Sequence, residues 1–244
     1  MRPGLVVVLF CAVGAAAAAA EVVFASGAVP TALIELFTSE GCSSCPPAER
    51  WLTDRRADAG LWRDFVPVAW HVTYWDQLGW PDRWAQPAFT ERQRAYAEAW
   101  RRDSMYTPCF VRDGAEWRPG RTAGPPRPAG VLQASYDIAT GDLAVVFRPA
   151  VAPGRALEVH AVQLGGGLVS SVQAGENAGV TLQHEFVALA VQHRELGLQG
   201  DAYHAALHLP VIADSAMPRR ALAVWVTRRG ELTPLQATGG WLEP

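Results

Sequence analysis

The feature that most constrains this chain is a Cys-x-x-Cys pair, Cys42 and Cys45, between an apolar run and a helix that begins with proline. The run over 32–37 is typical of a buried central strand, and Pro46 and Pro47 suit only the first turn of a helix. Two intervening residues bring the sulfurs within bonding distance. The N-terminus of a helix lowers the pKa of a thiol through its unpaired N–H groups and its dipole. The pattern therefore predicts a thiol pair suited to disulfide exchange, without naming a substrate.

The first twenty residues resemble a secretory signal. Residues 1–20 combine a basic start, an apolar stretch and a run of alanines, and cleavage after Ala20 fits best. We expect Cys11 to leave with this segment. Three cysteines then remain in a protein that is periplasmic or secreted, with no membrane anchor after cleavage, and disulfides persist in such oxidising compartments. The odd count leaves one thiol, that of Cys109, without an obvious partner.

The charge balance argues against several classes of partner. The 244 residues carry 21 basic and 24 acidic side chains, a formal net charge of −3, which gives no electrostatic case for nucleic acid or a membrane surface. No phosphate-binding glycine loop, serine triad or paired-carboxylate site can be recognised. We therefore predict no cofactor, and we expect the partners to be proteins that carry thiols or disulfides.

The first half has the order of elements of the thioredoxin core. A second strand is predicted over 65–70, a helix from Thr90 to about residue 102, and a hairpin over 109–117 with its turn at Asp113-Gly114. In the thioredoxin fold the proline that precedes this hairpin follows a cis bond and faces the cysteine pair. The sequence therefore predicts an α/β thioredoxin-like domain over 21–121, with a cis bond between Thr107 and Pro108.

The second half changes to short apolar runs separated by turn residues. A Pro/Gly-rich segment, 122–130, is predicted to be a linker, since it cannot form a helix interior. Residues 131–244 are predicted to be an antiparallel, sandwich-like β-domain. The run 182–192 is ambiguous between strand and helix. The expected strands cover 131–138, 143–148, 157–164, 168–172, 204–209 and 221–227.

Several segments resemble an uncharacterised family of exported bacterial proteins, domain of unknown function 1223. The longest match is LIELFTSEGCSSCPPA over 33–48, and shorter ones cover 71–76, 89–93, 106–108 and 175–179. The resemblance implies a thioredoxin-like fold and export, but no established reaction. The function has to be argued from the residues.

The leading hypothesis is a thiol–disulfide oxidoreductase that acts on protein thiols. Cys42 is predicted to attack a disulfide, and Cys45 to resolve the mixed intermediate. Ser43 and Ser44 fill the tight turn and could donate hydrogen bonds to a thiolate. Thr107 and Pro108 are predicted to shape the groove beside the pair.

Two further residues leave alternatives open. His71 either supplies a proton or a metal ligand near the sulfurs, or hydrogen-bonds structurally within the tryptophan-rich segment that follows it. Cys109 is either a third thiol near the pair or a buried cysteine that acts as a small hydrophobe. A copper- or zinc-binding or delivery module that uses Cys42, Cys45, His71 and Cys109 is therefore the second hypothesis. A non-catalytic binding protein with a structural disulfide is the third.

Overall fold

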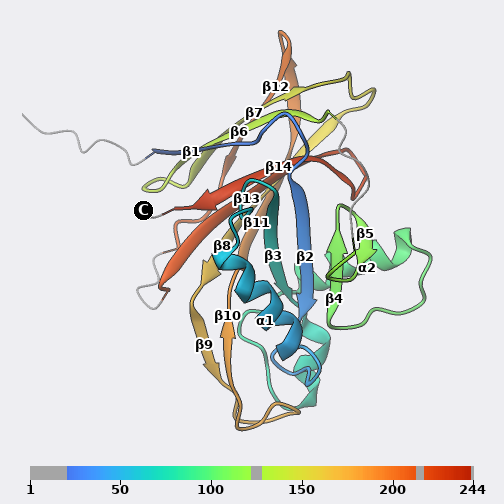
Figure 1. The fold of residues 1–244 in the computed structure, drawn as a ribbon, viewed down its shortest axis with the longest axis vertical. Coiled ribbons are helices and arrows are strands. Elements are labelled where there is room, and N and C mark those ends of the chain that lie inside the picture. The colour runs from blue at the N-terminus through green and yellow to red at the C-terminus, as the bar shows by residue number, and fades with distance from the viewer. Residues whose placement is uncertain (1–20, 122–127, 213–216, 243–244) are drawn as a thin grey trace, which may run out of the picture.

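The computed structural model describes residues 21–121, 128–212 and 217–242 (Figure 1). The predicted signal segment 1–20, with Cys11, and most of the predicted linker 122–130 lie outside the described residues. Within them, the strands and the hairpin predicted for the first half are confirmed, whereas the helix predicted from Thr90 begins earlier, with Gln86 and not Thr90 as its N-cap. Strands β2 (Ala32–Thr38) and β3 (Phe65–His71) pair in parallel, and every one of their residues is buried.

Helix α1 (Pro46–Asp54) follows β2, and helix α2 (Pro87–Ala99) follows β3. The short 3-10 helices η1 (Arg55–Ala57) and η2 (Thr73–Leu78) connect these elements. The predicted hairpin is present as β4 (Cys109–Arg112) and β5 (Ala115–Trp117), and β4 pairs antiparallel with the free side of β2.

The remaining strands come almost entirely from the second half of the chain. The run that was ambiguous, 182–192, consists of the end of one strand and the start of the next. The strands are β1 (Glu21–Ala25), β6 (Gly130–Asp137), β7 (Asp142–Pro149), β8 (Leu157–Gly166), β9 (Leu168–Ser171), β10 (Thr181–His184), β11 (Val187–Gln199), β12 (Ala202–His208), β13 (Arg219–Arg228) and β14 (Pro234–Trp241).

The predicted fold class, a thioredoxin-like domain followed by a sandwich-like domain, is wrong. Twelve strands form one mixed sheet whose main path runs β1-β6-β7-β12-β11-β3-β2-β4-β5, with β8, β13 and β14 branching from β11. Strand β11 belongs to the second half, yet it pairs in parallel with β3 of the first half, where Val187 is opposite Ala69. The backbone groups of a buried strand need hydrogen-bond partners from a neighbouring strand on each edge. The sequence does not say which segments supply these neighbours. The proposed domain boundaries around 121 and 131 stay a prediction.

The core contains a charged group whose partners tie α2 to the sheet. Glu35 on β2 is fully buried and accepts hydrogen bonds from Arg92 (Nε to Oε1, 2.5 Å), from Trp70 (2.9 Å) and from the hydroxyl of Tyr96. The Arg92 guanidinium also lies 5.0 Å from the ring centroid of Trp225 on β13. Removing one charge would leave the other unpaired inside the core.

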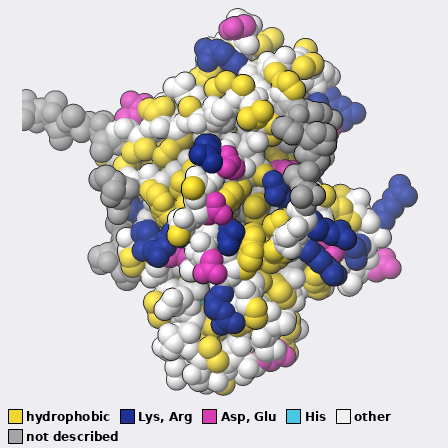
Figure 2. Space-filling model, in the orientation of Figure 1, with side chains coloured by type: hydrophobic (Ala, Val, Ile, Leu, Met, Phe, Trp, Pro, Cys, Tyr) yellow, Lys and Arg dark blue, Asp and Glu magenta, His cyan; other side chains and the backbone are white. Residues whose placement is uncertain are grey.

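Outside this core, β9 and β10 form a separate two-stranded hairpin beside α1 (Figure 1). On the face shown in Figure 2, arginine and acidic side chains are interspersed and do not gather in one patch. Among the described residues, no helix is both long and apolar enough to cross a bilayer.

Candidate functional site

The two cysteines form a disulfide at the start of α1. Their Cα atoms are 5.4 Å apart, and Cys45 is the N-cap residue, whose carbonyl accepts the N–H groups of Ala48 and Glu49. Both cysteines are fully buried, whereas Ser43 and Ser44 between them are exposed. The predicted pair is therefore present in its oxidised form, and only the turn between the sulfurs reaches the surface.

A loop of the second half lies against this turn. We call residues 173–179, between β9 and β10, the cap. The Asn177 amide donates to the carbonyl oxygens of Glu40 (2.8 Å) and Cys42 (3.0 Å), and Glu176 accepts from the N–H (3.0 Å) and hydroxyl (2.6 Å) of Ser43. These contacts hold the cap across the residues that carry the disulfide.

The bond between Thr107 and Pro108 is cis, as predicted. The Thr107 hydroxyl accepts a hydrogen bond from the indole N–H of Trp75 (2.8 Å). Trp75 in turn lies against Gly41, where an added Cβ would be only 3.1 Å from the Trp75 Cβ. The Thr-Pro segment is thus connected to the cysteine turn through one tryptophan, and Gly41 makes room for it.

Cys109 is a free, buried thiol on β4, where it pairs with Phe37 of β2. Burial raises its pKa to about 11, which the neighbouring Tyr106 hydroxyl only partly offsets. A thiol in this state is a poor nucleophile and a poor metal ligand at neutral pH. These properties favour the small-hydrophobe interpretation of Cys109.

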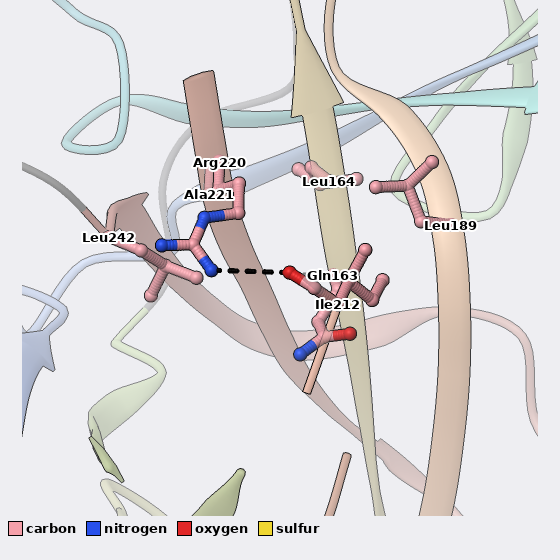
Figure 3. Close-up of a pocket in the computed structure, with 7 residues that line it drawn as sticks. All are labelled: Gln163, Leu164, Leu189, Ile212, Arg220, Ala221 and Leu242. Carbon is pink, nitrogen blue, oxygen red and sulfur yellow. Dashed lines mark hydrogen bonds between the residues drawn. The ribbon is translucent and has the colours of Figure 1, made fainter. Parts of the chain in front are cut away.

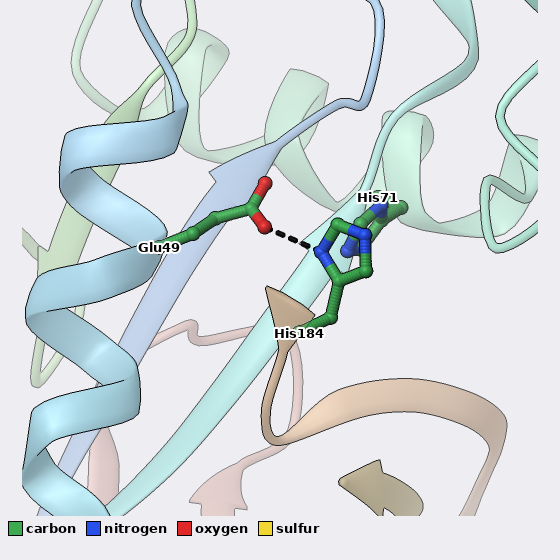
Figure 4. Close-up of side chains that lie close together, drawn as sticks. All are labelled: Glu49, His71 and His184. Carbon is green, nitrogen blue, oxygen red and sulfur yellow. Dashed lines mark hydrogen bonds and ion pairs between the residues drawn. The ribbon is translucent and has the colours of Figure 1, made fainter. Parts of the chain in front are cut away.

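His71 belongs to a buried cluster of acids and histidines that lies next to the cysteine turn. Its Nδ1 is 2.6 Å from Asp82 Oδ2, and its ring centroid is 5.1 Å from that of His184. Glu49 reaches from α1 to His184, the last residue of β10 (Oε2 to Nδ1, 2.5 Å), and His71 from the end of β3 lies behind it (Figure 4). Glu40 is 3.2 Å from His184 Nε2. Three segments far apart in the sequence meet here.

The electrostatics of this cluster follow from opposite charges in a dry site. Burial alone would lower the pKa of His184, but Glu49 and Glu40 outweigh it and raise that pKa to about 10. Burial would raise the carboxyl pKa values of Glu40, Glu49 and Asp82, but their histidine partners bring all three below the usual value. The acids are therefore ionised at neutral pH.

Three polar atoms in the cluster have no hydrogen bond among the described residues: Glu40 Oε1 and His184 Nε2, which contact each other only as an ion pair at 3.2 Å, and His71 Nε2. Buried polar atoms are nearly always paired, so an unpaired set at one place calls for an explanation.

A separate pocket is lined mostly by apolar side chains, unlike the acid–histidine cluster. Gln163, Leu164, Leu189, Ala221 and Leu242 line it, together with Ile212, whose carbonyl is 3.4 Å from Arg220 Nη1 (Figure 3). Its cavity volume of about 10 Å³ is room for a single water molecule.

Comparison with known proteins identifies the family. The family model for a protein of unknown function, DUF1223, matches residues 33–227. The chain belongs to the DUF1223 family. No curated protein matches it.

Two solved structures are similar in fold to this DUF1223 protein. One is protein AGR_C_4864 from Agrobacterium tumefaciens, with a TM-score of 0.59 and 21% identity over 86% of this chain and 93% of that chain. The other is HBP35 of Porphyromonas gingivalis, with a TM-score of 0.58 and 12% identity over 88% of this chain and 76% of that chain. At these identities the likeness concerns the fold alone.

The sequence interpretation missed most of the acid–histidine cluster. Glu40 precedes the cysteine pair in a turn, and Glu49 follows it in α1, and a glutamate at either position is ordinary in the sequence. Asp82 lies in the tryptophan-rich connector. The available signal was indirect: Glu49 is four residues after Cys45, on the face of α1 that carries the buried Leu52. His184 carried the family resemblance but gave no signal of its chemistry, because only the folded chain brings β10 against α1.

Proposed function

We propose that this DUF1223 protein is an exported thiol–disulfide oxidoreductase that acts on protein thiols through Cys42 and Cys45. The observation that carries the proposal is the closed disulfide at the first turn of α1. A disulfide across two residues at a helix start is well placed for exchange, because the helix N-terminus stabilises the thiolate that leaves. The signal-like residues 1–20 support export to a compartment where the disulfide persists.

When the protein acts as an oxidant, it converts two substrate thiols into a disulfide and is itself reduced. A substrate thiolate attacks Sγ of Cys42, the Cys42–Cys45 bond breaks, and Cys45 leaves as a thiolate that takes up one proton. A second substrate thiolate then attacks the substrate sulfur of the mixed disulfide, so the substrate leaves oxidised and Cys42 leaves as a thiolate. In the reverse direction, the Cys42 thiolate is the nucleophile and Cys45 resolves the mixed disulfide.

The burial of both sulfurs favours a second candidate, a binding protein in which the disulfide only locks the turn. Cys42 and Cys45 are fully buried, so a substrate reaches them only after part of the surrounding structure moves. The cap is the element whose movement disturbs least, since most of its residues are exposed and it is attached to the turn through Glu176 and Asn177. We therefore propose that the cap opens when a substrate exchanges with the pair.

The reduction potential distinguishes the two candidates. The oxidised protein is equilibrated in graded thiol buffers, and its thiols are counted by alkylation and mass spectrometry. A midpoint between about −120 and −270 mV is expected for an oxidoreductase, whereas a midpoint below about −300 mV is that of a structural disulfide and would overturn the proposal.

Variants test the assigned roles. Cys42→Ser is expected to abolish exchange with reduced or oxidised test proteins, and Cys45→Ser to accumulate mixed disulfides through Cys42. Cys109→Ser is the matched control, because it removes a thiol that is buried on β4 and should leave turnover unchanged. Turnover in Cys42→Ser at the wild-type rate would exclude the mechanism.

A further inference from the structure

We propose that Glu49, His71 and His184 form a buried site for one divalent cation of the Zn²⁺ type. One potential ligand atom from each of the three side chains lies within 4.8 Å of the other two, and all three residues are buried. Two imidazoles and a carboxylate are a ligand set that holds zinc in proteins, with a fourth position left for water or another ligand. The site differs from the one predicted from the sequence, since neither Cys42, Cys45 nor Cys109 takes part.

In each proposed ligand, one atom is held by a residue outside the set and the other is the proposed ligand atom. Of these ligand atoms, Glu49 Oε2 and His184 Nδ1 are hydrogen-bonded to each other in this structure. His71 Nδ1 is held by Asp82 (2.6 Å), which leaves Nε2 as the ligand atom, and Nε2 has no hydrogen-bond partner among the described residues. Glu49 Oε1 is held by the Thr38 hydroxyl (2.6 Å), which leaves Oε2 toward His184.

His184 completes this arrangement. Its Nε2 is 3.2 Å from Glu40 Oε1, an ion-pair contact without hydrogen-bond geometry, and its Nδ1, which faces Glu49, is the proposed ligand atom. Metal-bound histidines almost always donate their other N–H to a carboxylate or a carbonyl. Asp82 and Glu40 supply that carboxylate to His71 and His184 respectively.

An ion fits with a small movement. Ligand bonds of about 2.0–2.1 Å at a tetrahedral centre put the ligand atoms about 3.3 Å apart. Glu49 Oε2 and His184 Nδ1 are 2.5 Å apart, so they have to separate by less than about 1 Å, whereas ligand atoms at the 4.8 Å limit of the set have to approach by about 1.5 Å. A 2+ ion at this position would also face three carboxylates, those of Glu40, Glu49 and Asp82, which offset its charge in the buried site.

The test is a zinc count on the tag-free, oxidised protein. Because the site is buried, the chain is refolded from guanidinium without reductant in excess ZnCl₂. Unbound ion is then removed by gel filtration, and the metal is measured by mass spectrometry. Refolding is checked by far-UV circular dichroism. We expect one zinc per wild-type chain and none in His71→Ala or His184→Ala.

Matched variants separate this site from other ligands. His208→Ala removes an imidazole that also pairs with a carboxylate, Asp142 at 2.9 Å, but is 66% exposed, and it should keep the zinc. Asp82→Asn should weaken zinc binding by about 10–100-fold while leaving all three ligands in place. A variant with all three mature cysteines replaced by serine should also keep the zinc, and this result is independent of any redox activity.

The proposal is overturned if the refolded wild type carries no zinc, if His208→Ala loses as much zinc as His71→Ala, or if the cysteine-free variant loses it. Where a ligand variant does not refold, Co²⁺ bound to the wild type decides. Imidazole and carboxylate ligands give d–d bands without a thiolate charge-transfer band, and the appearance of that band would assign the ion to sulfur.

Discussion

The hydrogen bonds that hold the cap closed allow a quantitative prediction of how readily a small thiol reaches the disulfide. Asn177→Ala removes the two hydrogen bonds, of 2.8 and 3.0 Å, that join the cap to the carbonyls of Glu40 and Cys42. Buried hydrogen bonds contribute about 0.5–1.5 kcal/mol each, so the closed cap loses about 1–3 kcal/mol relative to the open one. The population of the open state then rises about 5- to 150-fold.

The assay is the rate at which excess dithiothreitol reduces Cys42–Cys45, followed by alkylation and mass spectrometry. When the cap opens and closes faster than the thiol reacts, this rate is proportional to the open population. We therefore expect Asn177→Ala to be reduced about 5- to 150-fold faster than wild type. Circular dichroism at the assay temperature verifies that the variant is folded, so that the increase reports on local opening.

The matched control is Gln173→Ala. Gln173 lies in the same loop and is exposed, but its side chain donates to Ser171 of the adjacent strand and not to the cysteine turn. It should be reduced at the wild-type rate. Equal rates for Asn177→Ala and wild type, or equal acceleration by both substitutions, would refute the idea that the cap controls access.

Three further predictions concern the core and the remaining thiol. Arg92→Ala leaves the Glu35 carboxylate unpaired in the core and should lower the free energy of unfolding by about 3–5 kcal/mol in guanidinium titrations, whereas exposed Arg94→Ala should change it by less than about 1 kcal/mol. Burial and the nearby Arg92 charge lower the pKa of His160 to about 3, so the unfolded chain binds the extra proton below about pH 6.5. His160 should therefore contribute a fall of about 2 kcal/mol in stability between pH 7 and pH 5, measured as the difference between the pH dependences of wild type and His160→Phe; equal pH dependences would contradict it. Cys109 should resist iodoacetamide in the native protein at pH 8 and react fully in denaturant, because its thiol is buried and its pKa is raised to about 11; fast native labelling would contradict its burial.

Local elements could be predicted because neighbouring residues determine them. The apolar run before the cysteines forms β2, the two prolines start α1, and Asp113-Gly114 turns the chain between β4 and β5. Asp113 and Gly114 both have positive φ, which suits a tight hairpin turn. The cis bond before Pro108 was predicted by analogy with the order of elements and is present, although the fold class inferred from that order is not.

The sheet could not be predicted, because pairing between distant strands leaves no periodic signal. Strand β11 illustrates this: it pairs with β8 over most of its length, with β3 at Val187, and with β12 over Gly197–Gln199. Its sequence is apolar at one end and polar at the other, in keeping with a strand that passes from the buried centre of the sheet to its exposed part. A pattern that changes along one strand reads from the sequence as ambiguity.

The candidate site was predictable only where the chemistry is local. Spacing identifies Cys42 and Cys45, since two residues in one turn suffice to place the sulfurs. The cluster of Glu49, His71 and His184 needs α1, β3 and β10 to converge, and each residue alone has an ordinary structural explanation.

Glu40 and Glu49 each contact both the disulfide turn and the proposed cation site, and this connects the two energetically. Glu40 accepts the Asn177 amide through its backbone carbonyl and faces His184 through its carboxylate, while the Glu49 N–H donates to the Cys45 carbonyl and its side chain is a proposed ligand. Any rearrangement of the cysteine turn on reduction therefore moves the backbone that positions both carboxylates. By thermodynamic reciprocity, if reduction changes the zinc affinity by some factor, zinc changes the reduction equilibrium by the same factor. The midpoint measured for Cys42–Cys45 should therefore differ between zinc-loaded and zinc-free protein, and identical midpoints would show that the two sites are independent despite their shared backbone.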